Sequence, residues 1–100
     1  MEITKKSSGN GEVTLEVKGK ITAVEEEAFG AALDEAVSET DNLKLDFKDV
    51  SYLSSSGLRT LVSAKKQIDA KAANMSIINA GRDVREVFEM TGLADLFGIQ

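Results

Sequence analysis

Apolar residues in the middle of this chain change their spacing at a run of three serines. Before the serines, Leu43, Leu45 and Phe47 occupy every second position, a spacing typical of a strand with one buried face. Beyond them the apolar residues recur at steps of three and four, on one stripe of a helix: Leu58, Leu61, Ala64, Ile68 and Ala72. The sequence therefore predicts a strand that feeds a helix, with the serines at the helix start.

The preceding segment also predicts strands followed by a helix. Turn-forming residues at 7–11 separate a short opening strand around Ile3 from a second strand, so we expect an antiparallel hairpin. Thr22 and Glu25 then have the spacing of a capping box, in which each side chain accepts a hydrogen bond from a free amide at the helix start. The second strand and the helix are indicated by these apolar residues: Val13, Leu15 and Val17, then Ala28 with Phe29, Ala32 with Leu33, and Ala36 with Val37.

The last third of the chain repeats the order of strand and helix. A strand, a short helix ending at Thr91 and Gly92, and a segment that closes the core are indicated in turn by Met75, Ile77 and Ile78, by Val84, Val87 and Phe88, and by Leu96, Phe97 and Ile99. The expected fold class is therefore α/β, with one domain over residues 1–100. Its mixed four-stranded sheet would begin with the antiparallel hairpin and continue in parallel βα units, with helices on one face.

Composition argues against several classes of function. The chain has no cysteine and no histidine, which removes thiolate chemistry, the commonest general base and common metal ligands, so we expect no metal and no cofactor. A net charge of −5 with dispersed basic residues argues against binding nucleic acid. No apolar run is long enough to cross a bilayer and no signal sequence opens the chain, so we expect no membrane partner and a cytoplasmic location.

The three serines have both a structural and a functional explanation. A serine hydroxyl at a helix start accepts a hydrogen bond from a free amide, and on composition alone this is the favoured explanation. The same amides and the positive end of the helix dipole also favour a phosphate on one hydroxyl. A serine nucleophile with Lys65 or Lys66 as its base is the enzymatic alternative, but both lysines lie beyond two turns of helix from Ser55, and we expect no enzyme.

Residues 49–58, Asp-Val-Ser-Tyr-Leu-Ser-Ser-Ser-Gly-Leu, resemble the phosphorylation loop of the STAS family of anti-sigma factor antagonists, whose usual form is D-[LV]-S-x-[LVMI]-D-S-[ST]-G-L. Residues 84–97 resemble the family's late helix and its Thr-Gly-Leu ending. With the opening strand and residues 17–21, the likeness covers essentially the whole chain. Family members often continue into one more helix, so we also expect one face of the core to be thinly covered or completed by a partner.

The resemblance implies a role for each serine. Ser55 aligns with the phosphorylated serine of the family, Ser56 would cap or support the helix, and Ser54 would be the loop residue before the acceptor. Family members often carry aspartate at the positions of Ser54 and Thr22, so both positions are more neutral here. We expect Thr22, Ser54 and Ser56 at the surface that a partner binds.

Three further residues complete the expected partner-binding surface. Gly57 lacks a Cβ, which would let a partner's backbone or a nucleotide approach the serines closely. Tyr52 has two explanations, an exposed interface anchor or a core residue. Leu58 follows directly at the helix start. The cations Arg59, Lys65 and Lys66 are interpreted as a solvated face.

By resemblance, the chain is expected to be an anti-sigma factor antagonist. Unmodified, it would bind an anti-sigma factor with serine kinase activity and so free a sigma factor. Phosphorylation of Ser55 would end the complex, and a phosphatase would restore it. The alternative is a constitutive STAS scaffold or small-ligand-binding domain in which the serine is never phosphorylated, and the non-acidic Thr22 and Ser54 favour it modestly.

Overall fold

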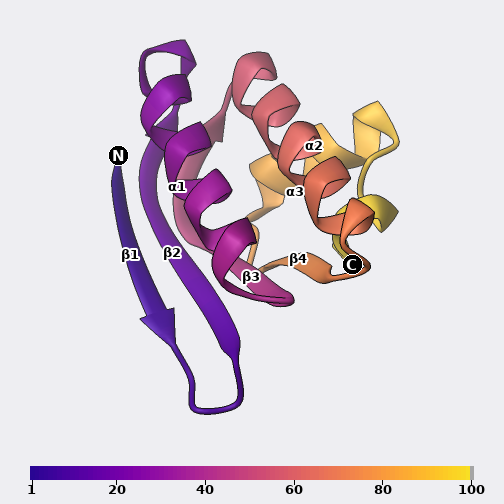
Figure 1. Ribbon diagram of the computed structural model, residues 1–100. Coiled ribbons are helices and arrows are strands. Elements are labelled where there is room, and N and C mark those ends of the chain that lie inside the picture. Colours follow the sequence, from indigo (N-terminus) through magenta and orange to yellow (C-terminus); the bar gives the residue numbers. More distant parts are fainter. Residues whose placement is uncertain (100) are drawn as a thin grey trace.

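The computed structural model describes residues 1–99, which form a sheet with helices packed against it (Figure 1). Within these residues the strand order is β1-β2-β3-β4. The strands are β1 (Glu2–Ser7), β2 (Glu12–Ile21), β3 (Asn42–Leu53) and β4 (Asn74–Ile78). The helices are α1 (Glu26–Glu39), α2 (Ser55–Ala70) and α3 (Arg82–Thr91), with short 3-10 turns η1 (Ala23–Glu25) and η2 (Asp95–Phe97).

The sheet topology confirms the predicted fold class. β1 and β2 pair antiparallel, whereas β2 with β3 and β3 with β4 pair parallel. Alternate side chains of β2, β3 and β4 are buried: Val13, Leu15 and Val17 on β2, Leu43, Leu45 and Phe47 on β3, and Met75 and Ile77 on β4. Figure 1 shows α1 and α2 side by side over the sheet. The intervening strand residues are partly or fully exposed, as expected when helices cover one face only.

The predicted helix ends are also present. Thr22 caps η1 with a complete capping box, and α1 continues directly from that turn. α3 ends at Gly92, whose φ of 74° is left-handed, and the Leu93 amide donates to the Phe88 carbonyl at 2.8 Å. The Phe88 ring meets Phe97 edge to face at 5.4 Å between centroids, so the segment after α3 closes the core as expected.

Three residues assigned to the core are not in it. Ala28 is exposed because it lies at the edge of the α1 stripe, where Phe29 faces the sheet instead. Ala72 lies beyond the end of α2 and takes a φ of 57°, so it cannot continue the helical stripe. Leu96 is 39% exposed because the η2 turn directs its neighbour Phe97 inward. These predictions were wrong at element ends, where the repeat stops.

β3 is longer than its alternating pattern predicts and runs up to Leu53, so no loop precedes α2 except Ser54. Its pairing with β2 contains two irregularities, because Glu16 to Lys18 opposes Asp46 to Asp49 and Gly19 to Lys20 opposes Val50 to Tyr52. Each leaves one extra residue on β3, as in a β-bulge. As a result Val50 and Leu53 both point into the core, although they are three positions apart and simple alternation would place them on opposite faces.

Candidate functional site

The ends of β2 and β3 meet at one edge of the sheet, at the top of Figure 1. Ile21 pairs with Leu53, and the Ser54 amide donates a hydrogen bond to the Ile21 carbonyl at 2.9 Å. Thr22 and Ser54, the next residue of each segment, therefore lie beside each other. Ligands of α/β proteins commonly bind outside the carboxyl ends of parallel strands, so this edge is the first candidate for function.

Ser54 caps α2, whereas the sequence analysis expected Ser56 to cap or support the helix. The Ser54 hydroxyl accepts a hydrogen bond from the Gly57 amide at 3.1 Å, and the Ser54 carbonyl accepts one from the Leu58 amide at 3.0 Å. Ser54 has extended backbone angles, which suit the residue before a helix. Ser54 is the one residue between β3 and α2, as expected, and its cap bond gives it a structural role that the sequence analysis did not assign to it.

Ser56 lies buried next to this cap and contacts the Ser54 hydroxyl. Its side chain is only 7% exposed, and its hydroxyl lies 3.1 Å from that of Ser54. Its carbonyl accepts a hydrogen bond from the Thr60 hydroxyl at 3.0 Å. The hydroxyl groups of Ser54 and Ser56 are thus both engaged within the protein, and Ser56 is not presented at the surface.

Ser55 differs from both neighbouring serines. It is the first residue of α2, its side chain is exposed, and its hydroxyl has no hydrogen-bond partner within residues 1–99. The first turn of α2 contains no acidic residue. A hydroxyl at this position is accessible to another molecule, and a negative charge on it would meet the positive end of the helix dipole.

Gly57 is buried, so the close approach that it permits is internal. A Cβ at this position would lie 2.9 Å from both Ile21 Cγ2 and Leu53 Cδ1. The residue therefore lets α2 pack directly on the two strand ends. This corrects the expectation that the missing Cβ makes room for a partner or a nucleotide.

Thr22 forms a closed helix start next to the serines. Its hydroxyl donates to the Glu25 carboxylate and accepts from the Val24 amide at 3.3 Å, and its own amide donates to Glu25 at 3.0 Å. Hydrogen bonds from the Thr22 hydroxyl, and then from its amide, hold the pKa of Glu25 below its usual value of 4.5. Thr22 is half-buried, so it shapes this edge and has no free hydroxyl to offer.

Two exposed apolar side chains lie on the segments that form this edge, Tyr52 on β3 and Val24 in η1. Tyr52 is 52% exposed, which decides between its two explanations in favour of a surface position. Val24 is 89% exposed at the η1 turn and was missed by the sequence analysis. Its position inside the capping box is the signal that could have found it, because a residue there cannot join the core stripe of α1. Leu58 is buried, with only 8% exposed, and it lines a groove beside α2.

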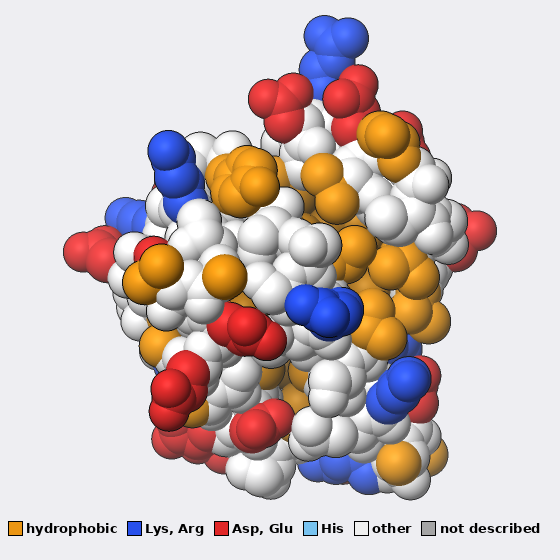
Figure 2. Space-filling model, turned by 90° about the horizontal axis from the view of Figure 1, so that it is seen from above, with side chains coloured by type: hydrophobic (Ala, Val, Ile, Leu, Met, Phe, Trp, Pro, Cys, Tyr) orange, Lys and Arg blue, Asp and Glu red, His pale blue; other side chains and the backbone are white. Residues whose placement is uncertain are grey.

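Figure 2 looks down on this end of the molecule. Hydrophobic side chains gather to the right of its centre, with basic groups beside them, and acidic groups are more numerous at the lower left. On α2, Arg59 is exposed one turn after Ser55, and Lys65 pairs with Asp69 at 2.8 Å. The cations of α2 are thus not equivalent, and the i,i+4 spacing of Lys65 and Asp69 is the sequence signal that could have separated them.

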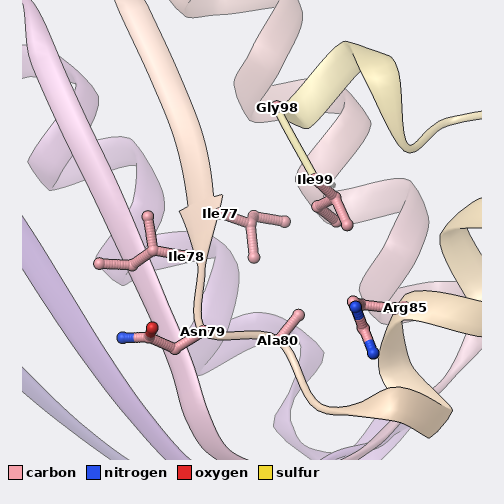
Figure 3. A pocket seen from close by; sticks show the side chains of 7 residues that line it. All are labelled: Ile77, Ile78, Asn79, Ala80, Arg85, Gly98 and Ile99. Atoms are coloured by element: carbon pink, nitrogen blue, oxygen red, sulfur yellow. The ribbon is translucent and has the colours of Figure 1, made fainter.

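A second hollow, of about 360 Å³, lies where β4 ends (Figure 3). Ile77 points toward Ile99 inside it, whereas Asn79 points away, and its amide donates to Asp46 at 3.2 Å. The polar groups of this hollow do not converge on one point. It is therefore a weaker candidate than the serine edge.

Over residues 1–99 no cluster of three or more acidic side chains is arranged to hold a metal ion. None of the helices in this range is both long enough and apolar enough to cross a membrane.

Comparison with known proteins gives a consistent result. The family model for the STAS domain matches residues 3–100. The anti-sigma-B factor antagonist of Listeria monocytogenes is 29% identical over 89 residues, which cover 88% of this chain and 78% of that protein.

Solved structures agree with this comparison. An anti-sigma factor antagonist from Mycobacterium paratuberculosis has a TM-score of 0.85 at 25% identity, covering 98% of this chain and 85% of that one. The anti-sigma factor antagonist SpoIIAA in its unphosphorylated form has a TM-score of 0.82 at 20% identity, covering 95% and 84%, and this likeness shows the shared fold.

Proposed function

Because the chain belongs to the STAS domain family, we propose that it is an anti-sigma factor antagonist controlled by phosphorylation of Ser55. In its unmodified form it binds an anti-sigma factor that is also a serine kinase. The sigma factor that the anti-sigma factor had held is then released. The chain is the substrate of that kinase and not a catalyst. This role requires the protein to act in the cytoplasm, where sigma factors meet RNA polymerase.

One observation carries the proposal. Of three consecutive serine hydroxyls, those of Ser54 and Ser56 are engaged within the protein, whereas Ser55 is exposed and unpaired. A structural cap needs one hydroxyl, and Ser54 already supplies it. Ser55 therefore has no structural task at this helix start, which supports its assignment as the phosphoacceptor.

The surroundings of Ser55 suit a binding surface. Tyr52 and Val24 are exposed apolar side chains, and aromatic anchors are common where proteins associate. Thr22 and Ser54 shape the edge between them, Ser56 supports it from below, and Leu58 continues it along α2. Gly57 contributes indirectly, because it lets α2 sit close to the strand ends.

Phosphorylation would reverse binding through charge. The kinase transfers the γ-phosphoryl group of ATP to Ser55 Oγ, a kinase base takes the hydroxyl proton, and ADP leaves. The product carries about −1.5 to −2 charges and three acceptor oxygens where the complex holds a neutral hydroxyl. The first-turn amides of α2 can stabilise the phosphate on the free protein, since no acidic side chain competes there. A phosphatase restores the binding form.

A phosphorylation assay tests the proposal. The protein is incubated with ATP and an anti-sigma serine kinase from the same genome, and its intact mass is measured. We expect a gain of one phosphate group that Ser55→Ala abolishes. Ser51→Ala is the matched control, because Ser51 is also exposed at the end of β3, and it should be phosphorylated like the wild type.

The second candidate function is a constitutive STAS scaffold or ligand-binding domain. It is favoured by the hydroxyl residues Thr22 and Ser54, which stand where family members often carry aspartate. The two functions predict different results in the phosphorylation assay. An unchanged mass, together with a Ser55→Asp variant that binds the anti-sigma factor as tightly as wild type, would exclude the phosphorylation switch and leave the scaffold.

A further inference from the structure

A shallow groove runs along α2 on the side away from α1. It lies between α2 and the turn that follows α3, and its volume is about 370 Å³. Its lining residues define what we name the α2 groove: Leu58, Arg59, Val62, Ser63, Lys66 and Leu93. Hydrophobic side chains with basic groups beside them gather on the corresponding side of Figure 2.

The groove exists because α2 has two apolar stripes. Leu61, Ala64 and Ile68 face the sheet and are buried. Leu58 and Val62 form a second, shorter stripe that Lys66 extends, and Val62 is only half-buried. The span from Leu58 to Lys66 is about 12 Å at 1.5 Å per residue, which is the length of about two turns of a helix.

The rim of the groove is positively charged. Arg59 and Lys66 are exposed, and neither has an ion-pair partner within residues 1–99. Lys65, on the same helix, is instead neutralised by Asp69. The lining contains no acidic residue, although the whole chain carries a net charge of −5.

We propose that the α2 groove binds an acidic amphipathic helix of a partner protein. Two apolar side chains of that helix, one turn apart, would cover Val62 and Leu93, and its flanking carboxylates would pair with Arg59 and Lys66. Nucleic acid is a poorer fit, because two cations neutralise too few phosphates. A small ligand is a poorer fit too, because the polar side chains that line the groove are all exposed.

The proposal goes beyond the phosphorylation switch and can be tested without the kinase. The probe is an alanine-based helical peptide of about 16 residues, long enough to hold its helix, with leucines one turn apart on one face and glutamates beside them. A peptide with lysine in place of every glutamate is its matched control. Both are titrated into the isotope-labelled protein while backbone amide resonances are followed by NMR.

We expect the acidic peptide to shift the amides of Val62, Ser63 and Leu93 in a saturable way. Two exposed ion pairs imply that the double variant Arg59→Glu/Lys66→Glu weakens binding by about fivefold or more, and that added salt does the same. The double variant Lys20→Glu/Lys48→Glu changes the net charge equally on exposed strand positions and should bind like the wild type. Val62→Asp should also weaken binding while the rest of the spectrum keeps its dispersion.

Three outcomes would overturn the proposal. The first is an acidic peptide that shifts no amide of the groove, and the second is a lysine peptide that binds equally well. The third is a protein that dimerises alone in sedimentation equilibrium and becomes monomeric on Arg59→Glu/Lys66→Glu, since the groove would then bind a second copy of this chain. None of these results depends on whether Ser55 is phosphorylated.

Discussion

The helix start after β2 and the one after β3 lie side by side, but only the first is closed by its own side chains. At the first, Thr22 and Glu25 satisfy each other's groups, and acidic residues occupy the first turns of η1 and α1. At the second, Ser54 makes a single cap bond, the position of the capping-box acid is taken by Gly57, and no acidic residue is present in the first turn.

This difference between the two helix starts means that the first one mainly stabilises the fold, whereas the second leaves groups available to another molecule. Glu25 supplies a negative charge to the first helix start, so that start is already electrostatically complete. The second start keeps unused amides and a free hydroxyl at Ser55. An incoming phosphate would therefore be stabilised at the second start and repelled at the first, although both belong to one edge of the sheet.

The largest effect on stability is expected where the second helix start meets the strand ends. Gly57→Ala introduces a Cβ 2.9 Å from Ile21 Cγ2, a methyl group that cannot swing away freely. Overpacking costs about 1–3 kcal/mol, and the better helix propensity of alanine offsets about 1 kcal/mol of it. We expect a net loss of up to about 2 kcal/mol in the free energy of unfolding, measured by urea denaturation.

Gly30→Ala is the matched control for this change. Gly30 lies inside α1, where a Cβ would be at an ordinary distance of 3.5 Å from Thr60 Cγ2. This variant should be more stable than the wild type by about 0.5–1 kcal/mol. If both alanine variants gain stability, the close packing of α2 on Ile21 and Leu53 is not a constraint.

The assignment of the cap to Ser54 predicts unequal effects within the serine run. Ser54→Ala removes the acceptor of the Gly57 amide and should cost about 1 kcal/mol. Ser55→Ala removes no hydrogen bond and should change the free energy of unfolding by no more than about 0.5 kcal/mol. Equal losses in the two variants would contradict the distinction between a cap and a free hydroxyl.

The first helix start should show a pH dependence that the second lacks. The pKa of Glu25 is lowered in the folded protein, so its carboxylate stabilises the fold above pH 4.5, and this contribution disappears as the pH falls through the folded-state pKa. The stability difference between wild type and Glu25→Gln should therefore shrink below pH 4.5. For Ser54→Ala the difference from wild type should stay constant, and denaturation series at several pH values compare the two.

Local patterns were sufficient to predict most of the fold. The alternating runs, the capping box at Thr22 and the Thr91–Gly92 ending were all confirmed, because each depends on residues close in sequence. The end of β3 was not predicted, because two bulges break its alternation and their positions depend on pairing with β2. Ala72 and Leu96 were misplaced because a repeat does not show where its element ends.

The candidate site was predicted in location but not in the tasks of its residues. The sequence places three serines at a helix start, yet it cannot tell which of their hydroxyl groups accepts the hydrogen bond from the Gly57 amide. That choice depends on how β3 enters the helix, and the Ser54 amide bond to Ile21 settles it in the fold. Gly57 was misinterpreted for the same reason, since its neighbours Ile21 and Leu53 belong to strands whose ends the sequence did not locate.

The central claim is that an uncharged Ser55 side chain is what the partner binds. It is tested most directly by measuring, with isothermal titration calorimetry, the affinity of the anti-sigma kinase for the unmodified protein and for protein fully phosphorylated at Ser55. We predict that phosphorylation weakens binding at least tenfold, or about 1.4 kcal/mol. Equal affinity of the two forms would contradict the account.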